Sequence, residues 1–152
     1  MVLQGIYVNI GSSTYLVVVS DIGIQLWSSN GENLLSFISL STLISEDGDH
    51  FLRGVTASDD FLAAGASTGD LFVFRTPNLS GETSVRYRLE SFRGRAITAL
   101  ASSMLYLVCG NDFGDIFAYS TDEAFPQACQ FPGRGMSCTG IQIADDVVIA
   151  GE

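Results

Sequence analysis

The sequence predicts an all-β protein made of short antiparallel strands, and three observations lead to this prediction. Runs of β-branched, aromatic and small apolar residues alternate with Gly, Asp, Asn and Ser, which is typical of strands joined by tight turns. No segment sustains the three- and four-residue spacing of an amphipathic helix; residues 33–44 come closest, but their serines and threonine favour a strand followed by a loop. The 152 residues are 47% apolar with a mean hydropathy of +0.31, which excludes an intrinsically disordered chain.

The strand pattern repeats about every 45 residues. Four apolar segments end in a small residue at positions 20, 65, 110 and 151, so their ends are spaced by 45, 45 and 41 residues. The first three lead through a turn containing Gly and Asp to a second segment ending in an aromatic residue, namely Trp27, Phe74 or Tyr119. One further strand candidate precedes each pair and another follows it. Each unit therefore holds four strands in ~40–45 residues, the period of a β-propeller blade.

The repeat makes residues 1–152 a partial β-propeller of about three and a half four-stranded antiparallel blades. We expect blade 1 at about residues 5–41, blade 2 at about 51–91, blade 3 at about 96–131, and a half blade 4 at about 138–152. One four-stranded sheet cannot bury both of its faces, whereas sheets stacked in a ring exclude water from each interface. The inner strands of each blade are therefore expected to be buried on both faces.

The residues at the end of each third strand resemble the conserved Trp-Asp pair that ends the third strand in the WD-repeat family. The Trp-Asp pair of that family is represented by Trp27-Ser28, Phe74-Arg75 and Tyr119-Ser120, so the aromatic residue is kept and the Asp is absent each time. Within the family, residues 23–31, 53–58 and 65–74 resemble one particular member. The resemblance implies an intracellular interaction adaptor with no catalytic residues. In the family, a buried network of His, Ser or Thr, Trp and Asp can stabilise each blade. No blade of this chain clearly contains all four, so apolar packing is expected to contribute more of the stability here than in typical members.

Three and a half blades are too few for a closed ring, because closed propellers need at least ~4 blades. An open arc leaves an apolar sheet face uncovered at each end, which favours association. We expect the ring to be completed by a further segment of a longer chain, by a second copy, or by a partner protein. The first of these is the favoured expectation.

Charge and cysteine content bear on partners and compartment. The chain has 17 acidic and 7 basic residues, a net charge of −10 and a pI near 4.2. Such an acidic surface repels phosphate backbones and anionic lipid, so neither nucleic acid nor a membrane is expected as a partner. We expect no signal peptide and no membrane-spanning helix. The three cysteines form no CxxC pair, which favours reduced thiols and a cytoplasmic location, with cytoskeletal or ciliary sites as variants.

The polar clusters favour turns over chemistry. Asp59-Asp60 and Asp145-Asp146 are paired carboxylates, but both follow a first strand, where Asp is common in hairpin turns. The acidic stretch 46–49 lacks the ligand spacing of a calcium-binding loop. His50 has no Ser or Cys at a known catalytic spacing. We expect no catalytic residue, no cofactor and no metal site.

The cysteines differ in their expected surroundings. Cys109 lies in an apolar strand and is expected to be an inert core thiol. Cys129 and Cys138 lie near the glycine-rich loop 132–135, so we expect both to be more exposed than Cys109.

One basic cluster is the best candidate for a binding surface. It consists of Arg86, Arg88, Arg93 and Arg95. Arg86 and Arg88 are two residues apart on a predicted outer strand, so their side chains share a face. The cluster either docks an acidic partner or phosphate group, or is a charged edge that prevents pairing between sheets.

These observations predict a non-enzymatic scaffold or adaptor for protein–protein interaction. Propeller rims present loops of several blades on a rigid frame, and binding residues are common on such loops. The alternative is a structural subunit of a large cytoskeletal or axonemal assembly, in which an obligate partner covers the open arc. An enzyme is the least supported class, because one His and several turn carboxylates do not make a convergent site.

Overall fold

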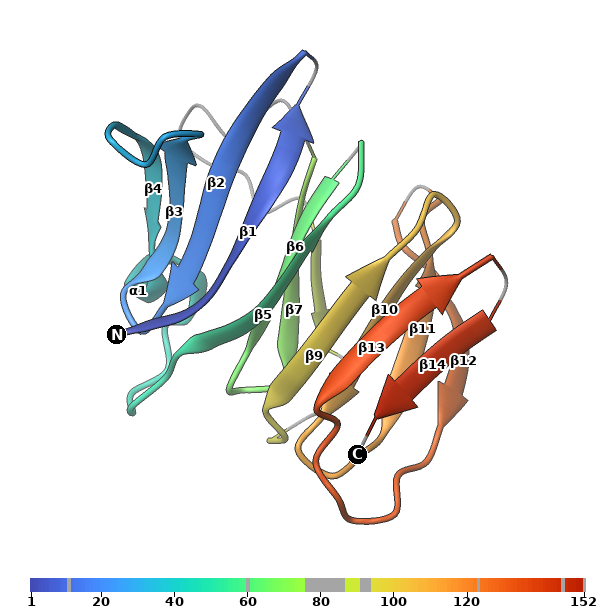
Figure 1. The fold of residues 1–152 in the computed structure, drawn as a ribbon. Helices are drawn as coiled ribbons and strands as arrows, with labels where there is room; N and C mark the ends of the chain where they lie inside the picture. Colours follow the sequence, from blue (N-terminus) through green and yellow to red (C-terminus); the bar gives the residue numbers. More distant parts are fainter. Residues whose placement is uncertain are drawn as a thin grey trace.

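The computed structural model describes the chain apart from Gly11, Asp60, residues 76–86 and 91–93, Glu123, Asp146 and Glu152. Three four-stranded antiparallel sheets and one two-stranded sheet follow one another in chain order and form an arc (Figure 1). This confirms the prediction of an all-β partial propeller with about three and a half four-stranded antiparallel blades. In every complete sheet the strands are paired in sequence order, so each sheet is a simple meander.

The complete sheets differ mainly in the lengths of their strands. Sheet 1 contains β1 (Val2–Ile10), β2 (Ser13–Ser20), β3 (Gly23–Ser28) and β4 (Leu34–Ser39). Sheet 2 contains β5 (Leu52–Ala57), β6 (Phe61–Ala66), β7 (Asp70–Arg75) and β8 (Tyr87–Glu90). Sheet 3 contains β9 (Ile97–Ser102), β10 (Tyr106–Asn111), β11 (Ile116–Ser120) and β12 (Gln127–Phe131). The long β1–β2 hairpin therefore extends beyond the neighbouring sheets (Figure 1).

Sheet 4 consists of β13 (Gly140–Ala144) and β14 (Val147–Gly151). Its first strand contacts β9, just as β9 contacts β5 and β5 contacts β1, so the first strands of successive sheets lie side by side. The loop expected after the strand of residues 33–44 begins with one helical turn, α1 (Leu40–Leu43). Leu43 in this turn is buried in the core between sheets 1 and 2, which explains why the segment is ordered despite its poor helix-forming residues.

Two apolar clusters join the sheets. The first lies between sheets 1 and 2, and the second lies between sheets 2 and 3. Phe61 and Phe125 pack edge to face in the second cluster, with their ring centroids 5.2 Å apart. All six residues of β6 are buried, as expected for an inner strand that has a sheet on each side. The stacking of the sheets thus buries the inner strand β6 on both faces, as the sequence predicted.

The aromatic residue of each third strand pairs with a leucine of the second strand. The pairs are Leu16 with Trp27, Leu62 with Phe74, and Leu107 with Tyr119. Leu16 therefore corresponds to Leu62 and Leu107, and the sequence alignment of segment 16–20 with 61–65 is wrong by one residue. The cause is the β2–β3 turn, which is one residue shorter than the β6–β7 and β10–β11 turns: Val19 pairs with Ile24, whereas Gly65 pairs with Leu71 and Gly110 with Ile116. Within the shorter turn the Ile22 N–H donates to Ser20 Oγ at 3.2 Å.

Glycines permit the closest approaches between sheets. A Cβ built on Gly65 would lie 2.4 Å from Ile97 Cγ2, and one on Gly110 would lie 2.6 Å from Cys138 Sγ. Both glycines lie near the ends of second strands, facing the first strand or connection of the next sheet. The small residues at these segment ends thus set the spacing between sheets.

Candidate protein-docking surfaces

The second strand of sheet 4 is exposed, although the second strands of sheets 2 and 3 are almost entirely buried. Val148 pairs with Ile143, as Leu62 pairs with Ala57 and Leu107 with Ser102. Val148 is 37% exposed, whereas Leu62 is 1% and Leu107 0% exposed. The difference arises because β14 has a partner strand on one edge only within the described residues, and nothing described covers its far face.

An apolar groove of about 770 Å³ separates sheet 3 from sheet 4. Sheet 3 contributes Ile116, Ala118 and Phe131 to its walls, and β14 contributes Val148 and Ala150. Most of the accessible groove surface is apolar, and Phe131 at its outer side is exposed. The groove is therefore an apolar surface beside an edge of β14 that has no partner strand within the described residues.

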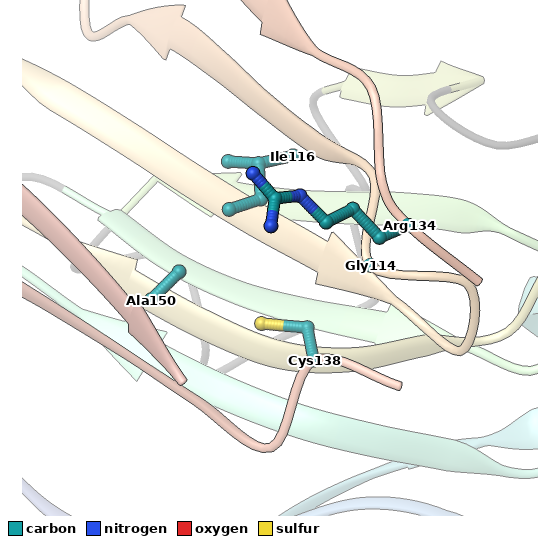
Figure 2. Close-up of a pocket in the computed structure, with 5 residues that line it drawn as sticks. All are labelled: Gly114, Ile116, Arg134, Cys138 and Ala150. Atoms are coloured by element: carbon teal, nitrogen blue, oxygen red, sulfur yellow. The ribbon is translucent and has the colours of Figure 1, made fainter. Parts of the chain in front are cut away.

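A second cavity of about 400 Å³ adjoins this groove, and Ile116 and Ala150 line both. Figure 2 shows the Arg134 side chain extended towards Ile116, with Cys138 and Ala150 opposite. Arg134 is exposed, and the connection that carries it is held by the Gly133 N–H, which donates to Asp115 Oδ1 at 2.7 Å. This arrangement places a cation on the wall of the cavity that adjoins the apolar groove.

The expectation that Cys138 is exposed is wrong. The side chain is 1% exposed, because it packs against Gly110 and its carbonyl accepts a hydrogen bond from Thr98 Oγ1 at 2.6 Å. Cys129 is exposed and Cys109 is buried, as expected. The burial of Cys138 had no signal in the sequence, because it depends on where the connection between sheets 3 and 4 crosses β10.

A second open surface lies on sheet 1, on the face turned away from sheet 2. The register places Tyr7, Leu16, Trp27 and Phe37 on this face. Tyr7 is 65% and Phe37 46% exposed, while Trp27 is partly buried and donates from Nε1 to Gln25 Oε1 at 3.2 Å. This sheet-1 face is rich in aromatic side chains, which are enriched at protein interfaces.

The N-terminus lies against the same end of the arc. The terminal ammonium is 2.5 Å from Asp21 Oδ1, and its hydrogen bond lowers the pKa of the Asp21 carboxyl. Both groups are exposed, so their ion pair adds little to stability.

The predicted arginine cluster is only partly described. Arg86 and Arg93 lie outside the described residues, and of Arg88 only the backbone, paired with Phe72, is described. Arg95 is exposed, and its guanidinium lies 4.6 Å from the centre of the Phe113 ring in the β10–β11 turn. Arg95 thus links the connection before sheet 3 to a turn of that sheet, and binding by the cluster stays a prediction.

The remaining polar candidates lie where turns were expected. Asp59 follows β5 and Asp145 follows β13, while Asp60 and Asp146 lie outside the described residues. Within the described part of the chain, no three His, Cys, Asp or Glu side chains gather as metal ligands would. The Nε2 atom of His50 is buried and has no hydrogen-bond partner among the described residues. No helix in the described ranges is long and apolar enough to cross a bilayer.

Stacked four-stranded meanders with aromatic third strands define a WD-type β-propeller. The chain belongs to the WDR54 family, whose model matches residues 1–152. It is 26% identical to human WD repeat-containing protein 54 in an alignment 149 residues long, and the match covers 90% of this chain and 43% of the human protein. The mouse protein is also 26% identical, with the same coverage. The chain therefore spans less than half the length of the curated relatives it matches.

Solved structures with low sequence identity share the fold. The Saccharomyces cerevisiae Sqt1 structure has a TM-score of 0.79 at 18% identity and covers 97% of this chain and 42% of Sqt1. The computationally designed Ika8 protein has a TM-score of 0.74 at 20% identity and covers 99% of this chain and 42% of Ika8. Chaetomium thermophilum Sqt1, bound to the N-terminus of the ribosomal protein L10, has a TM-score of 0.73 at 17% identity and covers 93% of this chain and 39% of that one.

Proposed function

We propose that the chain acts as a non-enzymatic scaffold for protein–protein interaction. The observation that carries this proposal is a pair of apolar surfaces that no described residue covers: the sheet-1 face and the groove beside β14. Apolar patches of this kind on folded proteins mark interaction sites. Family membership supports the proposal, and so does the binding of a polypeptide end by the similarly folded Chaetomium Sqt1.

The chemistry of the partner follows from the surfaces. The sheet-1 face is aromatic and the groove is apolar, so hydrophobic polypeptide segments fit better than phosphate backbones. The chain's net charge of −10 supports the same choice, because it opposes approach of nucleic acid and anionic lipid. We assign no catalytic residue, and a cytoplasmic location stays a prediction from the cysteines.

Affinity purification with the tagged full chain tests the proposal. The test variant replaces Tyr7 and Phe37 by Ser, which removes two exposed apolar side chains from the sheet-1 face. The control variant replaces Met104 and Leu105 by Ser, because these exposed apolar residues lie in the β9–β10 turn, away from that face. Since aromatic anchors dominate interface energies, we expect recovery of a stoichiometric partner to fall at least ~10-fold for the first variant only.

Two results would count against the scaffold. One is that the wild-type chain recovers no stoichiometric partner under conditions in which it is folded by circular dichroism. The other is that both variants lose recovery equally, which would indicate nonspecific hydrophobic adsorption.

A further inference from the structure

The turn between the second and third strands is anchored in the same way in all three complete sheets. Its tip residue is followed by a glycine of positive φ, namely Gly23, Gly69 or Gly114. The carbonyl oxygen of the tip residue accepts a hydrogen bond from the backbone of the connection after the sheet, over 2.8, 3.3 and 3.0 Å. The acceptors are Ile22, Thr68 and Phe113, and the donors are the N–H groups of Leu40, Gly94 and Gly135. The backbone therefore fixes each turn, whichever side chain the tip residue carries.

Phe113 differs from the tip residue of sheet 2 in what its side chain does. Thr68 Oγ1 donates to Asp70 Oδ2 at 2.8 Å and so stays within its own turn. The Phe113 side chain is 40% exposed. The fold thus explains the position of Phe113, but it does not require an aromatic side chain there.

A cation lies over the exposed Phe113 ring. The Arg95 guanidinium carbon is 4.6 Å from the ring centre, and Arg95 is itself exposed. Its backbone is held close to the turn, because the Asp112 N–H donates to the Ala96 carbonyl at 3.0 Å. Arg95 forms no ion pair within the described residues, so its charge has no carboxylate partner there.

The corresponding position in sheet 2 shows that the arginine is not a requirement of the fold. The Ser67 N–H donates to the Phe51 carbonyl at 2.9 Å, in the same way as the turn of sheet 3 bonds to Ala96. His50 precedes Phe51 as Arg95 precedes Ala96, and His50 is partly buried. Sheet 3 therefore presents an Arg and Phe pair at the surface where sheet 2 has other residues.

The connection after sheet 3 extends this surface on the other side of the ring. A Cβ built on Gly135 would lie 3.5 Å from Phe113 Cε2, so this glycine lies against the ring edge. Met136 follows it and is 58% exposed. We call the set of Arg95, Phe113, Gly135 and Met136 the Arg95–Phe113 surface. It joins one cation to an apolar area on a frame fixed by backbone hydrogen bonds.

The carboxylates nearest in sequence leave the guanidinium available. The Asp115 carboxylate is already engaged, because it accepts hydrogen bonds from Asn111 Nδ2 at 3.0 Å and from the Gly133 N–H at 2.7 Å. Asp112 is exposed beside Phe113 in the turn and would repel an acidic ligand weakly. The cation favours an anionic ligand, and the net charge of −10 disfavours a phosphate backbone as that ligand. A polypeptide with a few carboxylates fits both conditions.

We propose that the Arg95–Phe113 surface binds an acidic segment of a partner protein. A carboxylate of the segment lies on the Arg95 guanidinium, and an adjacent apolar side chain packs on Phe113 and Met136. The planar guanidinium offers paired N–H donors to a carboxylate while its face rests on the ring. Because the ring holds the guanidinium in place, binding loses less side-chain entropy. This inference rests on the proposed scaffold function and gives it a third surface of different chemistry.

Selection from a phage-displayed library of random peptides tests the proposal without a known partner. The library is first depleted on the Arg95→Gln variant, which removes peptides that bind the apolar surfaces elsewhere, and is then selected on the wild-type full chain. We expect the enriched peptides to contain Asp or Glu beside an apolar residue. The same peptides are synthesised with a fluorescent label, and their binding is measured by fluorescence anisotropy.

Matched variants locate the site. Arg95→Gln should weaken binding at least ~10-fold, and Arg95→Lys about threefold, because lysine keeps the charge without the planar donor pair. Arg53→Gln removes the same charge from an exposed side chain on β5 and should change binding less than about twofold. Asp112→Asn should strengthen binding about twofold, since it removes a like charge beside the site. A gain in affinity cannot result from loss of folding.

Several outcomes would overturn the proposal. They are absence of enrichment, equal effects of Arg95→Gln and Arg53→Gln, and peptides whose binding survives replacement of every Asp and Glu by Asn and Gln. If single-stranded oligothymidylate displaced the labelled peptides at lower concentration than an unlabelled peptide did, the surface would belong to nucleic acid instead. Failure of the selection, together with partner capture that depends on Tyr7 and Phe37, would remove this surface and leave the scaffold proposal standing.

Discussion

β6 and β14 are corresponding strands with opposite surroundings. Both are second strands of apolar and small residues, and both contain a glycine near the end, Gly65 in β6 and Gly151 in β14. Every residue of β6 is buried, whereas every described residue of β14 is exposed. The apolar content of a strand therefore does not determine its burial here. The sheets on either side do, because β6 lies between two of them and β14 lies beside one.

This difference predicts where the free energy of unfolding resides. Apolar side chains contribute to stability by the area that they remove from water, so those of β6 and β10 contribute fully and those of β14 contribute partly. A partner that covers β14 would therefore increase the free energy of unfolding, because it would bury apolar side chains that are now exposed. Corresponding substitutions in buried and exposed strands make this comparison quantitative.

The largest expected contrast is between Leu107→Ala and Val148→Ala. Leu107 is 0% exposed, so its truncation leaves a cavity between sheets 2 and 3 and should lower the free energy of unfolding by about 2–5 kcal/mol. Val148 already contacts water, and its truncation should cost less than about 1 kcal/mol. Urea titration followed by far-ultraviolet circular dichroism measures both values. Similar losses in the two variants would mean that β14 is covered in solution.

A smaller contrast concerns two corresponding glycines. Gly65→Ala would place a Cβ 2.4 Å from Ile97 Cγ2, which forces sheets 2 and 3 apart and should cost about 1–3 kcal/mol. Gly151→Ala meets only Thr139 Oγ1 at 3.4 Å and should be close to neutral. Thermal unfolding monitored by circular dichroism checks both variants. A neutral Gly65→Ala variant would contradict the close packing of these sheets.

The fold could be predicted from the sequence because each repeat of about 45 residues forms one sheet, and such a sheet can bury its apolar faces only against neighbouring sheets. The aromatic ends at Trp27, Phe74 and Tyr119 identified the third strands, and the uncovered ends of the arc followed from the number of units. The one-residue error in sheet 1 arose because a shorter turn shifts the pairing without changing the apolar pattern. Turn length depends on local hydrogen bonds such as that to Ser20 Oγ, which a pattern of apolar residues does not record.

The candidate site was less predictable for a similar reason. Arg134 and Cys138 lie on the connection between sheets, and their positions depend on contacts with Asp115, Gly110 and Thr98 that are far away in the sequence. The arginines at positions 86–95 are close together in the sequence and were predicted to form one binding surface. In the structure, Arg95 contacts the aromatic ring of Phe113 in sheet 3. Periodicity predicts strands well, whereas it contains little information about the connections between them.

The smallest expected effect compares the two arginines on successive connections. Arg95 lies over the Phe113 ring, so Arg95→Gln removes a cation–π contact and should lower the free energy of unfolding by about 0.5–1 kcal/mol. Arg134 is exposed beside the cavity that adjoins the groove, and the free energy of unfolding of the Arg134→Gln variant should lie within about 0.3 kcal/mol of the wild-type value, because Arg134 forms no ion pair within the described residues. Urea titration at matched salt concentration distinguishes the two variants if their midpoints are measured in parallel. The Phe113→Leu variant is the control, because it keeps an apolar side chain while removing the aromatic ring, and Arg95→Gln should then cost nothing further. An equal loss for both arginines would mean that Arg134 contributes to folding.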